Sequence, residues 1–286
     1  RLGRVVAVEH SELWGGLVDL DPATSPDESA SLLSGELGDP GKERQLAFRD
    51  GQRYVARIVR HDDRSATMRP IGFRTDASYL ITGGLGGLGL EVARWMAEQG
   101  ARRLILMGRS ELPARSEWAE VEEGTICADR IAAIRELEGL GASVRLAAVD
   151  VTDEARLAAF LKEYERESWP PIRGVIHAAG LTRDQLLVRM DMADFSAVLR
   201  PKVWGAWLLH SLLAEAPLDF FVLFSSVASI LGSFGQANYA AANAFMDSLA
   251  HHRRARDLPA QSVNWGPWAQ VGMAAAGKKQ AKKALE

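Results

Sequence analysis

The stretch "YLITGGLGGLG", Tyr79 to Gly89, joins a strand-length apolar run to a glycine-rich loop and then to a helical pattern. Gly84, Gly86 and Gly89 fit the spacing G-x-G-x-x-G. Between a strand and a helix, this spacing lets backbone approach a pyrophosphate, and the helix N-terminus supplies aligned N–H donors. A glycine-rich turn without a ligand is the alternative, but the strand–loop–helix context favours a dinucleotide site.

Apolar runs of strand length alternate with helical patterns from Ser78 onward. The strand-like runs are "YLIT", "RLILMG", "VRLAAVD", "GVIHAAG", "FFVLFSS" and "QSVNW". Buried strands separated by helices are typical of a parallel sheet covered on both faces. The sequence therefore predicts an α/β fold with a doubly wound parallel sheet, similar to a Rossmann domain.

The first part of the chain, residues 1–72, has a different texture and shows no catalytic motif. Within it, "RQLAFRDGQRYVARIVR" predicts a hairpin that turns at Asp50 and Gly51. Residues 61–78 are interpreted as a linker, and the polar insertion 111–130 as a surface loop. We expect a structural part at 1–72 and a sheet-forming part at 73–286.

The composition excludes several classes of protein. The chain is 47% hydrophobic and 25% charged with a net charge of −3, which gives no reason to expect nucleic acid or an anionic membrane as a partner. No apolar run is long enough to span a bilayer, and the N-terminus lacks a signal-peptide pattern. Cys127 is the only cysteine, so we expect no intrachain disulfide and a reducing compartment such as the cytoplasm. The sequence predicts no metal site, and we expect the chain to be a piece of a longer protein.

The residues after the second predicted strand indicate which nucleotide binds. NAD-binding proteins usually place an acid about 20 residues after the glycine loop, to accept the ribose 2′-hydroxyl. Here that region offers Gly108, Arg109 and Ser110 and no carboxylate. Arg109 could pair with a 2′-phosphate, so we favour NADPH over NADH, with a surface arginine as the alternative. Asp150, which ends "LAAVD", could contact the adenine or could be a helix N-cap.

A serine and a tyrosine form the candidate catalytic pair. Ser226 lies at the end of "FFVLFSS", the edge where doubly wound sheets bind ligands. Tyr239 and Asn243 lie one turn apart on a predicted helix and share a face. The tyrosine could give a proton to a carbonyl oxygen that the serine hydroxyl also holds. Because a phenol with a pKa near ~10 is a poor acid–base group at neutral pH, we expect a cation beside it.

The glycine loop, "HAAG" and the Ser…Tyr pair resemble the short-chain dehydrogenase/reductase superfamily. That superfamily usually has Tyr-x-x-x-Lys, with an asparagine on the preceding helix. Here Asn243 holds the place of the lysine, and "LRPKVWGAWLLH" puts Lys202 on the preceding helix. This exchange, together with "FSSVASILGSFGQANYAAANAF" and "VNWGPWAQVGMA", is similar to the ketoreductase domains of modular type I polyketide synthases. The resemblance covers roughly residues 78–273.

The resemblance implies a function and the residues that perform it. It implies NADPH-dependent reduction of a β-ketoacyl chain carried by the phosphopantetheine arm of an acyl carrier protein, with neighbouring polyketide synthase domains as partners. The implied catalytic residues are Tyr239, Ser226, Lys202 and Asn243. Lys202 would supply the missing cation, lower the pKa of the phenol and hold the ribose, while Asn243 would position Lys202 or a water. Residues 1–72 would be the C-terminal part of a degenerate subdomain, and residues 73–286 the catalytic one.

The implied cofactor contacts lie on the glycine loop, at the ends of neighbouring strands and at the catalytic pair. They are Thr82, Gly83, Gly84, Leu85, Gly86, Gly87, Leu88, Arg109, Ser110, Asp150, Val151, Ala178, Ala179, Gly180, Lys202, Tyr239 and Pro267.

Within this family, the loop after "HAAG" indicates which face of the ketone is reduced. A Leu-Asp-Asp motif there marks the class that makes the D-configured hydroxyl, the B type. This chain has Thr182, Arg183 and Asp184, and keeps the second aspartate. Leu231 stands where the opposite class usually carries tryptophan, so we expect a D-hydroxy product. Ala241 stands where a proline would suggest an epimerising subtype, which favours an α-carbon that is not epimerised.

Two other functions stay open at this point. A free-standing short-chain alcohol dehydrogenase would act on a small ketone, but the Lys/Asn exchange and the extra N-terminal region count against it. A catalytically silent scaffold should have lost Tyr239, Ser226 or Lys202, and all three are present.

Overall fold

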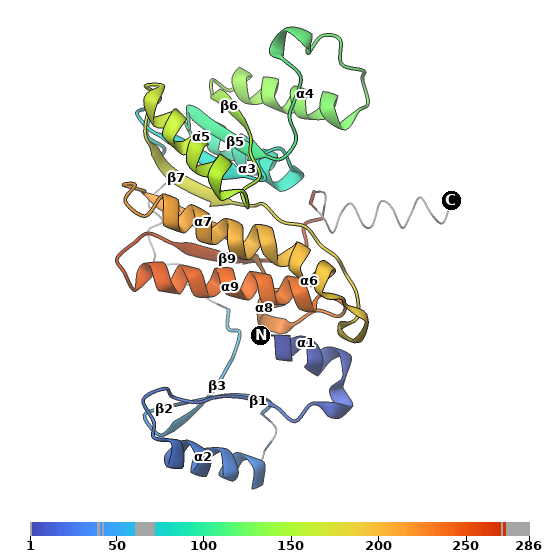
Figure 1. The fold of residues 1–286 in the computed structure, drawn as a ribbon, viewed down its shortest axis with the longest axis vertical. Helices are drawn as coiled ribbons and strands as arrows, with labels where there is room; N and C mark the ends of the chain where they lie inside the picture. Colours follow the sequence, from blue (N-terminus) through green and yellow to red (C-terminus); the bar gives the residue numbers. More distant parts are fainter. Residues whose placement is uncertain (1, 39–40, 42, 61–71, 270, 273–286) are drawn as a thin grey trace, which may run out of the picture.

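The structure is a computed structural model, which describes residues 2–38, 41, 43–60, 72–269 and 271–272. It contains two separate sheets (Figure 1): one with the order β1-β2-β3, and a six-stranded one with the order β6-β5-β4-β7-β8-β9. Every neighbouring pair in the larger sheet is parallel. Its strands are β4 (Ser78–Thr82), β5 (Arg103–Gly108), β6 (Ser143–Ala148), β7 (Ile172–His177), β8 (Phe220–Ser226) and β9 (Gln261–Trp265).

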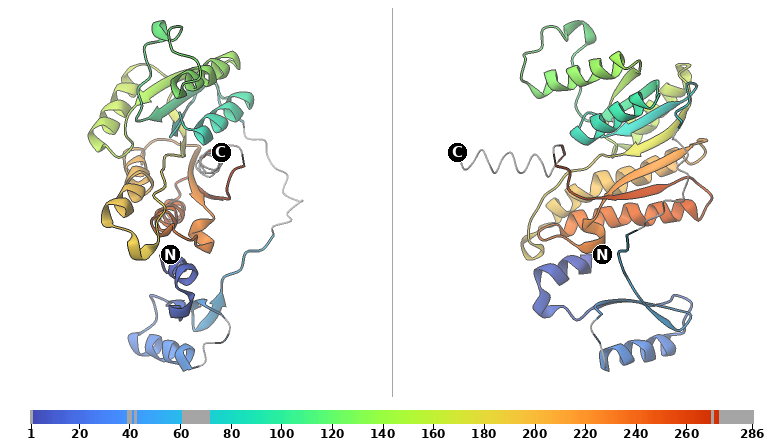
Figure 2. Two further views of the ribbon diagram at one scale, coloured as in Figure 1. Left: turned by 90° about the vertical axis from the view of Figure 1, so that its right-hand side faces the viewer. Right: turned by 180° about the vertical axis from the view of Figure 1, so that it is seen from behind.

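Helices cover both faces of this sheet, because alternate strand residues point to opposite sides (Figure 2). Leu80 belongs to a core cluster with residues of α5, α7 and α9, whereas its neighbour Ile81 belongs to a cluster with residues of α3 and α4. The predicted doubly wound, Rossmann-like sheet is therefore confirmed. The helices are α3 (Gly87–Glu98), α4 (Ile126–Gly139), α5 (Glu154–Arg166), α6 (Met192–Leu199), α7 (Gly205–Leu212), α8 (Ala228–Leu231) and α9 (Ala237–Arg254).

The strand order reverses direction between β4 and β7, which pair in register from Tyr79 with Gly174 to Thr82 with His177. In open parallel sheets, ligands bind outside the carboxyl ends of the strands at such a reversal. The fold therefore places a binding site beside the end of β4, where the glycine loop begins.

The smaller sheet is formed by the N-terminal part of the chain. Its hairpin is confirmed: Asp50 and Gly51 have φ values of 51° and 71°, as a two-residue hairpin turn with two left-handed residues requires. Among the described residues of its strands only Leu46 and Phe48 are buried. The elements of this part are α1 (Leu2–Glu9), η1 (Ser11–Leu13), β1 (Leu17–Asp19), α2 (Pro26–Gly38), β2 (Gln45–Arg49) and β3 (Gln52–Val55).

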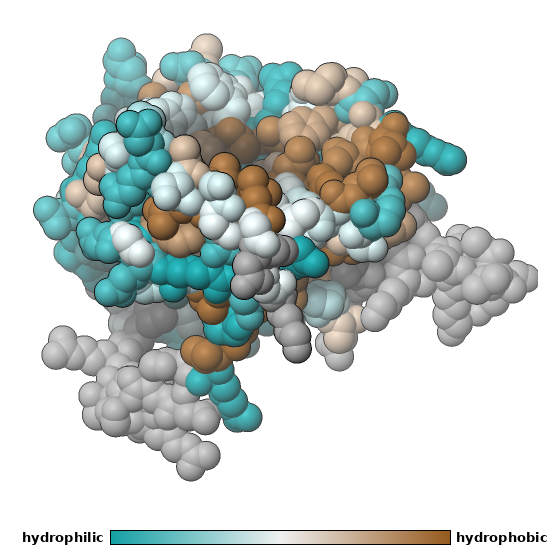
Figure 3. Space-filling view, turned by 90° about the horizontal axis from the view of Figure 1, so that it is seen from below, coloured by the Kyte–Doolittle hydropathy of each residue, from teal (hydrophilic) through white to brown (hydrophobic). Residues whose placement is uncertain are grey.

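Apolar side chains stay exposed in patches on the face of the molecule seen from below (Figure 3). In the N-terminal part, Leu13 and Leu37 are 76% and 77% exposed. The N-terminal part thus has few buried strand side chains and keeps large apolar side chains exposed.

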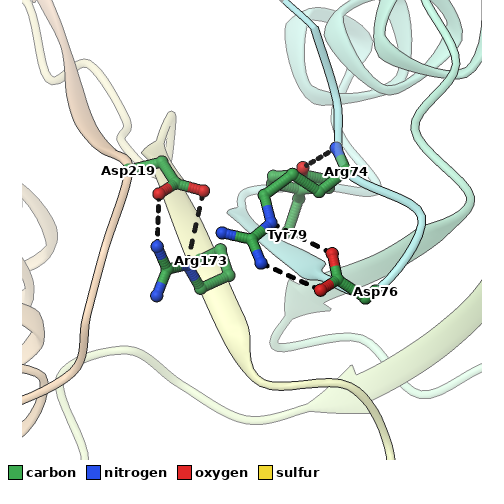
Figure 4. Close-up of polar contacts among 5 residues, drawn as sticks. All are labelled: Arg74, Asp76, Tyr79, Arg173 and Asp219. Atoms are coloured by element: carbon green, nitrogen blue, oxygen red, sulfur yellow. Dashed lines mark hydrogen bonds and ion pairs between the residues drawn. The ribbon is translucent and has the colours of Figure 1, made fainter.

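Ion pairs and hydrogen bonds fasten the amino edge of the large sheet (Figure 4). Arg74 pairs with Asp76 at 2.8 Å, and its backbone N–H donates to the Tyr79 hydroxyl at 2.7 Å. Arg173 pairs with Asp219 at 2.6 Å where β7 and β8 begin. Of the expected linker 61–78, residues 61–71 lie outside the described residues. Its last part is held against β4 by the hydrogen bond from Arg74 to Tyr79.

The insertion 111–130 is more than the surface loop that was expected. Trp118 is only 6% exposed and belongs to the same buried cluster as Ile131 and Ile134 of α4. Its ring nitrogen donates to the Pro113 carbonyl at 2.9 Å. The rest of the stretch up to Thr125 is a largely exposed loop apart from the short 3-10 turn Arg115–Glu117, so the expected surface loop is confirmed there, with Trp118 anchoring it to the core.

Candidate active site

The glycine loop between β4 and α3 is packed too closely for side chains at several positions. Gly83 has φ +67°, and a Cβ there would lie 2.9 Å from the Ala179 nitrogen. A Cβ on Gly84 would lie 2.7 Å from the Ile81 oxygen, and one on Gly89 would overlap the Gly83 carbonyl. The loop is thus folded back under the start of α3, and its backbone forms a cradle at a helix N-terminus, which suits a pyrophosphate.

A pocket of about 640 Å³ lies against this loop at the carboxyl ends of β4 to β7. Its volume is in the range of about 300–1,000 Å³ that small-molecule and cofactor sites have. The expected contact residues that line it are Thr82, Gly83, Leu85, Gly86, Gly87, Leu88, Arg109, Ser110, Asp150, Val151, Ala178, Ala179 and Gly180.

Four expected contact residues do not line this pocket: Gly84, Lys202, Tyr239 and Pro267. Gly84 lies beneath the loop, where a Cβ would approach the Leu106 Cα at 2.9 Å. Pro267 is exposed beyond the end of β9. Lys202 is buried and does not line the pocket, whereas its chain neighbour Pro201 and Gly180, which packs against its side chain, do.

Three arginines outside the predicted set also line the pocket: Arg130, Arg183 and Arg200. Arg130 comes from α4, and its Nε donates to the Leu85 carbonyl at 3.2 Å. With Arg109, they give the pocket four guanidinium groups, against one acidic residue, Asp150, among its described lining residues. Such a charge balance suits phosphate groups. No local pattern marks Arg130, because only the fold brings α4 to the glycine loop.

Asp150 organises a turn at the pocket wall. Its Oδ1 accepts hydrogen bonds from the Thr152 nitrogen and the Thr152 hydroxyl, both at 2.9 Å. The N-cap of α5 is Asp153, whose carboxylate accepts from the Arg156 nitrogen at 3.0 Å. The alternative that Asp150 caps the helix is therefore wrong, and Asp150 remains a pocket residue.

Lys202 is a buried amine next to the tyrosine ring. It lies in η4 (Arg200–Trp204), a π-helical turn between α6 and α7, and is 3% exposed. Its Nζ donates to the Phe224 carbonyl at 2.9 Å and lies 5.3 Å from the centroid of the Tyr239 ring. Burial lowers the pKa of Lys202 to about 7, and the negative charge of Asp247 opposes this shift. Gly180 leaves room for the side chain, since a Cβ there would lie 2.8 Å from the Lys202 Cε.

His177 joins the glycine loop to the turn that carries Lys202. Its Nε2 lies 3.0 Å from the Pro201 carbonyl, and its Nδ1 lies 2.7 Å from the Thr82 hydroxyl. A carbonyl only accepts, so Nε2 carries the proton and Nδ1 accepts from Thr82. Burial, aided by the charge of Lys202, lowers the pKa of His177 to about 3. His177 is therefore neutral, and it links two segments by hydrogen bonds rather than acting as an acid–base group.

Tyr239 lies in the first turn of α9, and Asn243 one turn later is fully buried. The Asn243 Nδ2 donates to the Tyr239 backbone oxygen at 2.7 Å, while its Oδ1 is buried and accepts no hydrogen bond among the described residues. Ser226 ends β8, and its Oγ accepts from the Ala228 nitrogen at 3.2 Å. Lys202, Tyr239 and Ser226 thus come together from η4, α9 and β8.

The pKa of Tyr239 moves in the opposite direction from the one expected. Burial raises it, and polar contacts with the side chains of Asn243 and Ser226 oppose the rise, while the charge of Asp184 adds to it. We expected Lys202 to lower the pKa of Tyr239, and this expectation is wrong. The burial of the phenol raises the pKa more than the neighbouring polar side chains lower it. The raised pKa keeps the phenol protonated at neutral pH.

A buried acid, Asp247, lies one turn beyond Asn243 on α9. Its carboxylate accepts from the hydroxyls of Ser229 and Ser262 at 2.6 and 2.7 Å and from the Asn264 amide at 3.0 Å. The same amide donates to the Ser225 hydroxyl at 3.1 Å. Sequence reasoning missed Asp247, although its spacing from Tyr239 and Asn243 puts the three on one helix face.

The loop with Asp184 lies beside the loop that precedes Tyr239. The Asp184 carboxylate accepts from the Gln236 side-chain amide at 3.0 Å, and the Gln185 nitrogen donates to the Gly235 carbonyl at 2.8 Å. Leu231 on α8 is 57% exposed. The residue expected to control stereochemistry is thus attached to the start of the helix that carries Tyr239.

Two kinds of feature are absent from the part of the chain that the structure describes. No helix in it combines the length and apolarity that crossing a bilayer requires. Nor does it hold three or more His, Cys, Asp or Glu side chains grouped as metal ligands.

The parallel sheet, the glycine loop and the Lys202 amine beside the Tyr239 ring fit the short-chain dehydrogenase/reductase superfamily, whose ketoreductase domains use a nicotinamide cofactor. The family model of the KR domain matches residues 77–270, and the chain belongs to this family, the ketoreductase domains of polyketide synthases. Members reduce ketones with a nicotinamide cofactor, so the chain is an oxidoreductase.

Relatives with known names agree with this assignment. The chain is 41% identical over 272 residues to "5-methyl-1-naphthoate synthase" of Streptomyces sahachiroi, an alignment that covers 95% of the chain and 15% of that protein. It is 42% identical over 274 residues to a phenolphthiocerol/phthiocerol polyketide synthase protein of Mycobacterium tuberculosis, covering 96% and 14%. The chain therefore spans about 15% of the length of these relatives.

Solved structures give the same result. "Structure of A-type Ketoreductases from Modular Polyketide Synthase" has a TM-score of 0.80 and 40% identity, covering 99% of this chain and 56% of that one. "Structure of A1-type ketoreductase" has a TM-score of 0.81 and 39% identity, covering 98% and 56%.

Proposed function

We propose that the chain uses NADPH to reduce the β-keto group of an acyl chain on an acyl carrier protein, and that the product is a D-configured 3-hydroxyacyl group. The observation that carries this proposal is the approach of the Lys202 amine to 5.3 Å from the Tyr239 ring centroid, at the same end of the sheet as the glycine loop. Lys202 is a buried amine with a strongly lowered pKa, and groups perturbed in this way cluster at functional sites.

The pocket residues fit a dinucleotide phosphate. The glycine loop offers backbone donors to a pyrophosphate, and Arg109 and Arg130 offer guanidinium groups to a 2′-phosphate. The absence of an acid among Gly108, Arg109 and Ser110 supports NADPH over NADH. When bound, this cofactor supplies the hydride.

The protein supplies the proton and holds the ketone oxygen. Tyr239 donates its phenolic proton to that oxygen, and its raised pKa keeps the proton available at neutral pH. The Ser226 hydroxyl donates a hydrogen bond to the same oxygen and stabilises the charge that develops on it. Lys202, next to the pocket-lining Gly180 and beside the Tyr239 ring, orients the ribose side of the cofactor and exchanges protons with Tyr239. Asn243 fixes the first turn of α9 through its bond to the Tyr239 carbonyl.

Asp184 supports the D configuration. Its hydrogen bond from Gln236 links this acid to the start of α9, and position 231 carries a leucine where the opposite class usually has tryptophan. Two of the similar structures are of A-type ketoreductases, so similarity of fold does not decide the facial choice. Ala241 supports a reaction in which the α-carbon of the substrate is not epimerised.

The partners follow from the proposed substrate: an acyl carrier protein and neighbouring polyketide synthase domains. We further propose that residues 1–72 are the C-terminal part of a structural subdomain and residues 73–286 the catalytic subdomain. The separate β1–β3 sheet with its small core supports this division.

One experiment tests the function. The protein is incubated with a racemic 2-methyl-3-keto thioester and NADPH, the absorbance at about 340 nm is followed, and the product stereoisomers are resolved. We expect NADPH consumption and one dominant D-hydroxy isomer, with little turnover of a simple ketone. A folded protein that binds NADPH and consumes none would indicate a scaffold, and a preference for simple ketones would indicate a free-standing alcohol dehydrogenase.

A further inference from the structure

The N-terminal helix α1 packs against α9 of the large-sheet part of the molecule, and Arg4 also ties it to the smaller sheet that follows it in sequence (Figure 1). Val5 is fully buried in a cluster with Ala237 and Ala240 of α9, the helix of Tyr239. The partly buried Leu187 and Met190 pack on the same cluster. The KR family model begins at residue 77, so α1 lies outside the part of the chain that defines the family.

Glu9, the last residue of α1, joins two loops that are far apart in sequence. Its Oε2 accepts a hydrogen bond from the Leu187 backbone nitrogen at 2.8 Å, and its Oε1 accepts one from the Gly235 backbone nitrogen at 2.8 Å. Leu187 follows Asp184 in the loop after β7, and Gly235 precedes Tyr239 in the loop before α9. One carboxylate therefore satisfies a backbone donor in the loop that carries Asp184 and another in the loop that leads to Tyr239.

The same two loops also touch each other directly, at the contacts from Gln185 to Gly235 and from Gln236 to Asp184. The Glu9 carboxylate closes this arrangement into a three-way junction. Hydrogen bonds to an ionised acceptor are short and roughly twice as strong as neutral ones. The junction therefore fixes the distance between the loop that carries Asp184 and the loop that leads to Tyr239.

Contacts of Arg4 hold the rest of α1 in place. An Arg4 terminal nitrogen donates to the Ser229 carbonyl on α8 at 2.9 Å, and its Nε donates to Gln45 at 2.8 Å. Gly232 has φ +77°, and a Cβ there would lie 2.8 Å from the Arg4 carbonyl oxygen. Glu9 thus acts from a fixed helix, and its carboxylate position is determined by the packing of Val5 and Arg4.

We propose that Glu9 is a positioning residue for stereocontrol. Its carboxylate keeps the loop with Asp184 and the loop before Tyr239 in a fixed relative position, and α1 thereby determines which face of the ketone is presented to the tyrosine. This inference rests on the proposed ketoreductase function. It assigns a role to a helix in which the sequence shows no chemistry.

The test is the substitution Glu9→Gln, which keeps the size of the side chain but leaves one oxygen to accept where two now do. Amide hydrogen exchange is measured over residues 183–190 and 232–237, together with KM and the isomer ratio of the product. We expect faster exchange in both loops, a loss of about tenfold in the isomer ratio and a raised KM for the thioester, since a bond to a charged acceptor typically contributes that much. The Kd for NADPH should stay unchanged.

Two further variants separate positioning from folding. Glu12→Gln removes a carboxylate that is 67% exposed and contacts His10, and it should change none of these readouts. Glu9→Asp keeps the charge but has a shorter side chain, so it should lower the isomer ratio by less than Glu9→Gln does. The proposal is overturned if the Gln and Asp variants lower thermal stability or speed exchange but give the wild-type isomer ratio, or if exchange rises in neither loop. A wild-type protein that reduces no β-keto thioester would refute the proposed function, while the exchange data would still decide whether Glu9 joins the loops.

Discussion

The buried amine of Lys202 should make the stability of the protein depend on pH in a way that one substitution removes. Burial lowers the pKa of Lys202 from 10.5 to about 7 in the folded protein. Below pH 7 the amine is charged in both the folded and unfolded states, and the folded state bears the cost of the buried charge. Between pH 7 and 10.5 the unfolded chain keeps the proton that the folded protein has lost, so the free energy of unfolding rises with pH. Above 10.5 both states are neutral and the slope vanishes.

The size of this effect follows from the shift. Each pH unit well inside the window contributes about 1.4 kcal/mol, and the first unit contributes less because the folded amine is still half protonated at pH 7, so the range from pH 7 to pH 9 should add about 2 kcal/mol to the free energy of unfolding. Lys202→Met removes the titrating group and keeps an unbranched side chain of similar length. The lost hydrogen bond to the Phe224 carbonyl shifts the stability of the variant by the same amount at every pH.

Urea denaturation of the wild type and of Lys202→Met at a series of pH values measures the difference directly, because all other titrating groups are shared. We expect the wild type to gain about 2 kcal/mol on the variant between pH 7 and pH 9. Lys162→Met, at an exposed lysine of α5, is the matched control and should show no such gain. Parallel curves for the wild type and Lys202→Met would show that the amine is not desolvated and would refute the reasoning.

Three further substitutions test the other parts of the site. Tyr239→Phe should lower kcat by about 10²–10⁴-fold, as the loss of a general acid does, with the NADPH Kd from fluorescence titration little changed; normal turnover would remove Tyr239 from the chemistry. Arg109→Ala should reduce the ratio of kcat/KM for NADPH to that for NADH, and an unaltered ratio would place recognition of the 2′-phosphate elsewhere. Gly180→Ala would put a Cβ 2.8 Å from the Lys202 Cε, so kcat should fall while circular dichroism stays native; full activity would mean that the lysine position is not critical.

The sequence was sufficient for the features that depend on local patterns. The strands Phe220–Ser226 and Gln261–Trp265 have the bounds that their apolar runs predict, and the Asp50–Gly51 turn has the two positive φ values that its residues favour. The pocket lies where the glycine loop predicts it, because a strand, a glycine turn and a helix in that order leave the backbone little choice.

The sequence was insufficient for contacts between distant segments. Glu9 and Arg130 reach the site from helices outside its motifs, and nothing in their neighbourhood in the sequence marks them. The approach of Lys202 to Tyr239 was expected only through a resemblance to known ketoreductases. The predicted direction of the pKa shift of Tyr239 was wrong, because the shift depends on how deeply the phenol is buried. Burial depends on the whole fold, whereas a sequence pattern indicates only which residues lie near one another.

That shift also explains how the pair can work. Burial disfavours the charged form of each group, so it lowers the pKa of the Lys202 ammonium and raises that of the Tyr239 phenol. At neutral pH the phenol then holds the proton that the proposed reaction consumes. Lys202, with a pKa of about 7, is half protonated in the same range, and Asp247 keeps its charged form accessible. His177 beside it stays neutral and cannot take this role, since its pKa is about 3. A proton lost by Tyr239 is therefore best replaced from the Lys202 side of the ring, and the rate should fall as the pH rises through the titration of the lysine, which is the alkaline limb of the pH–rate profile.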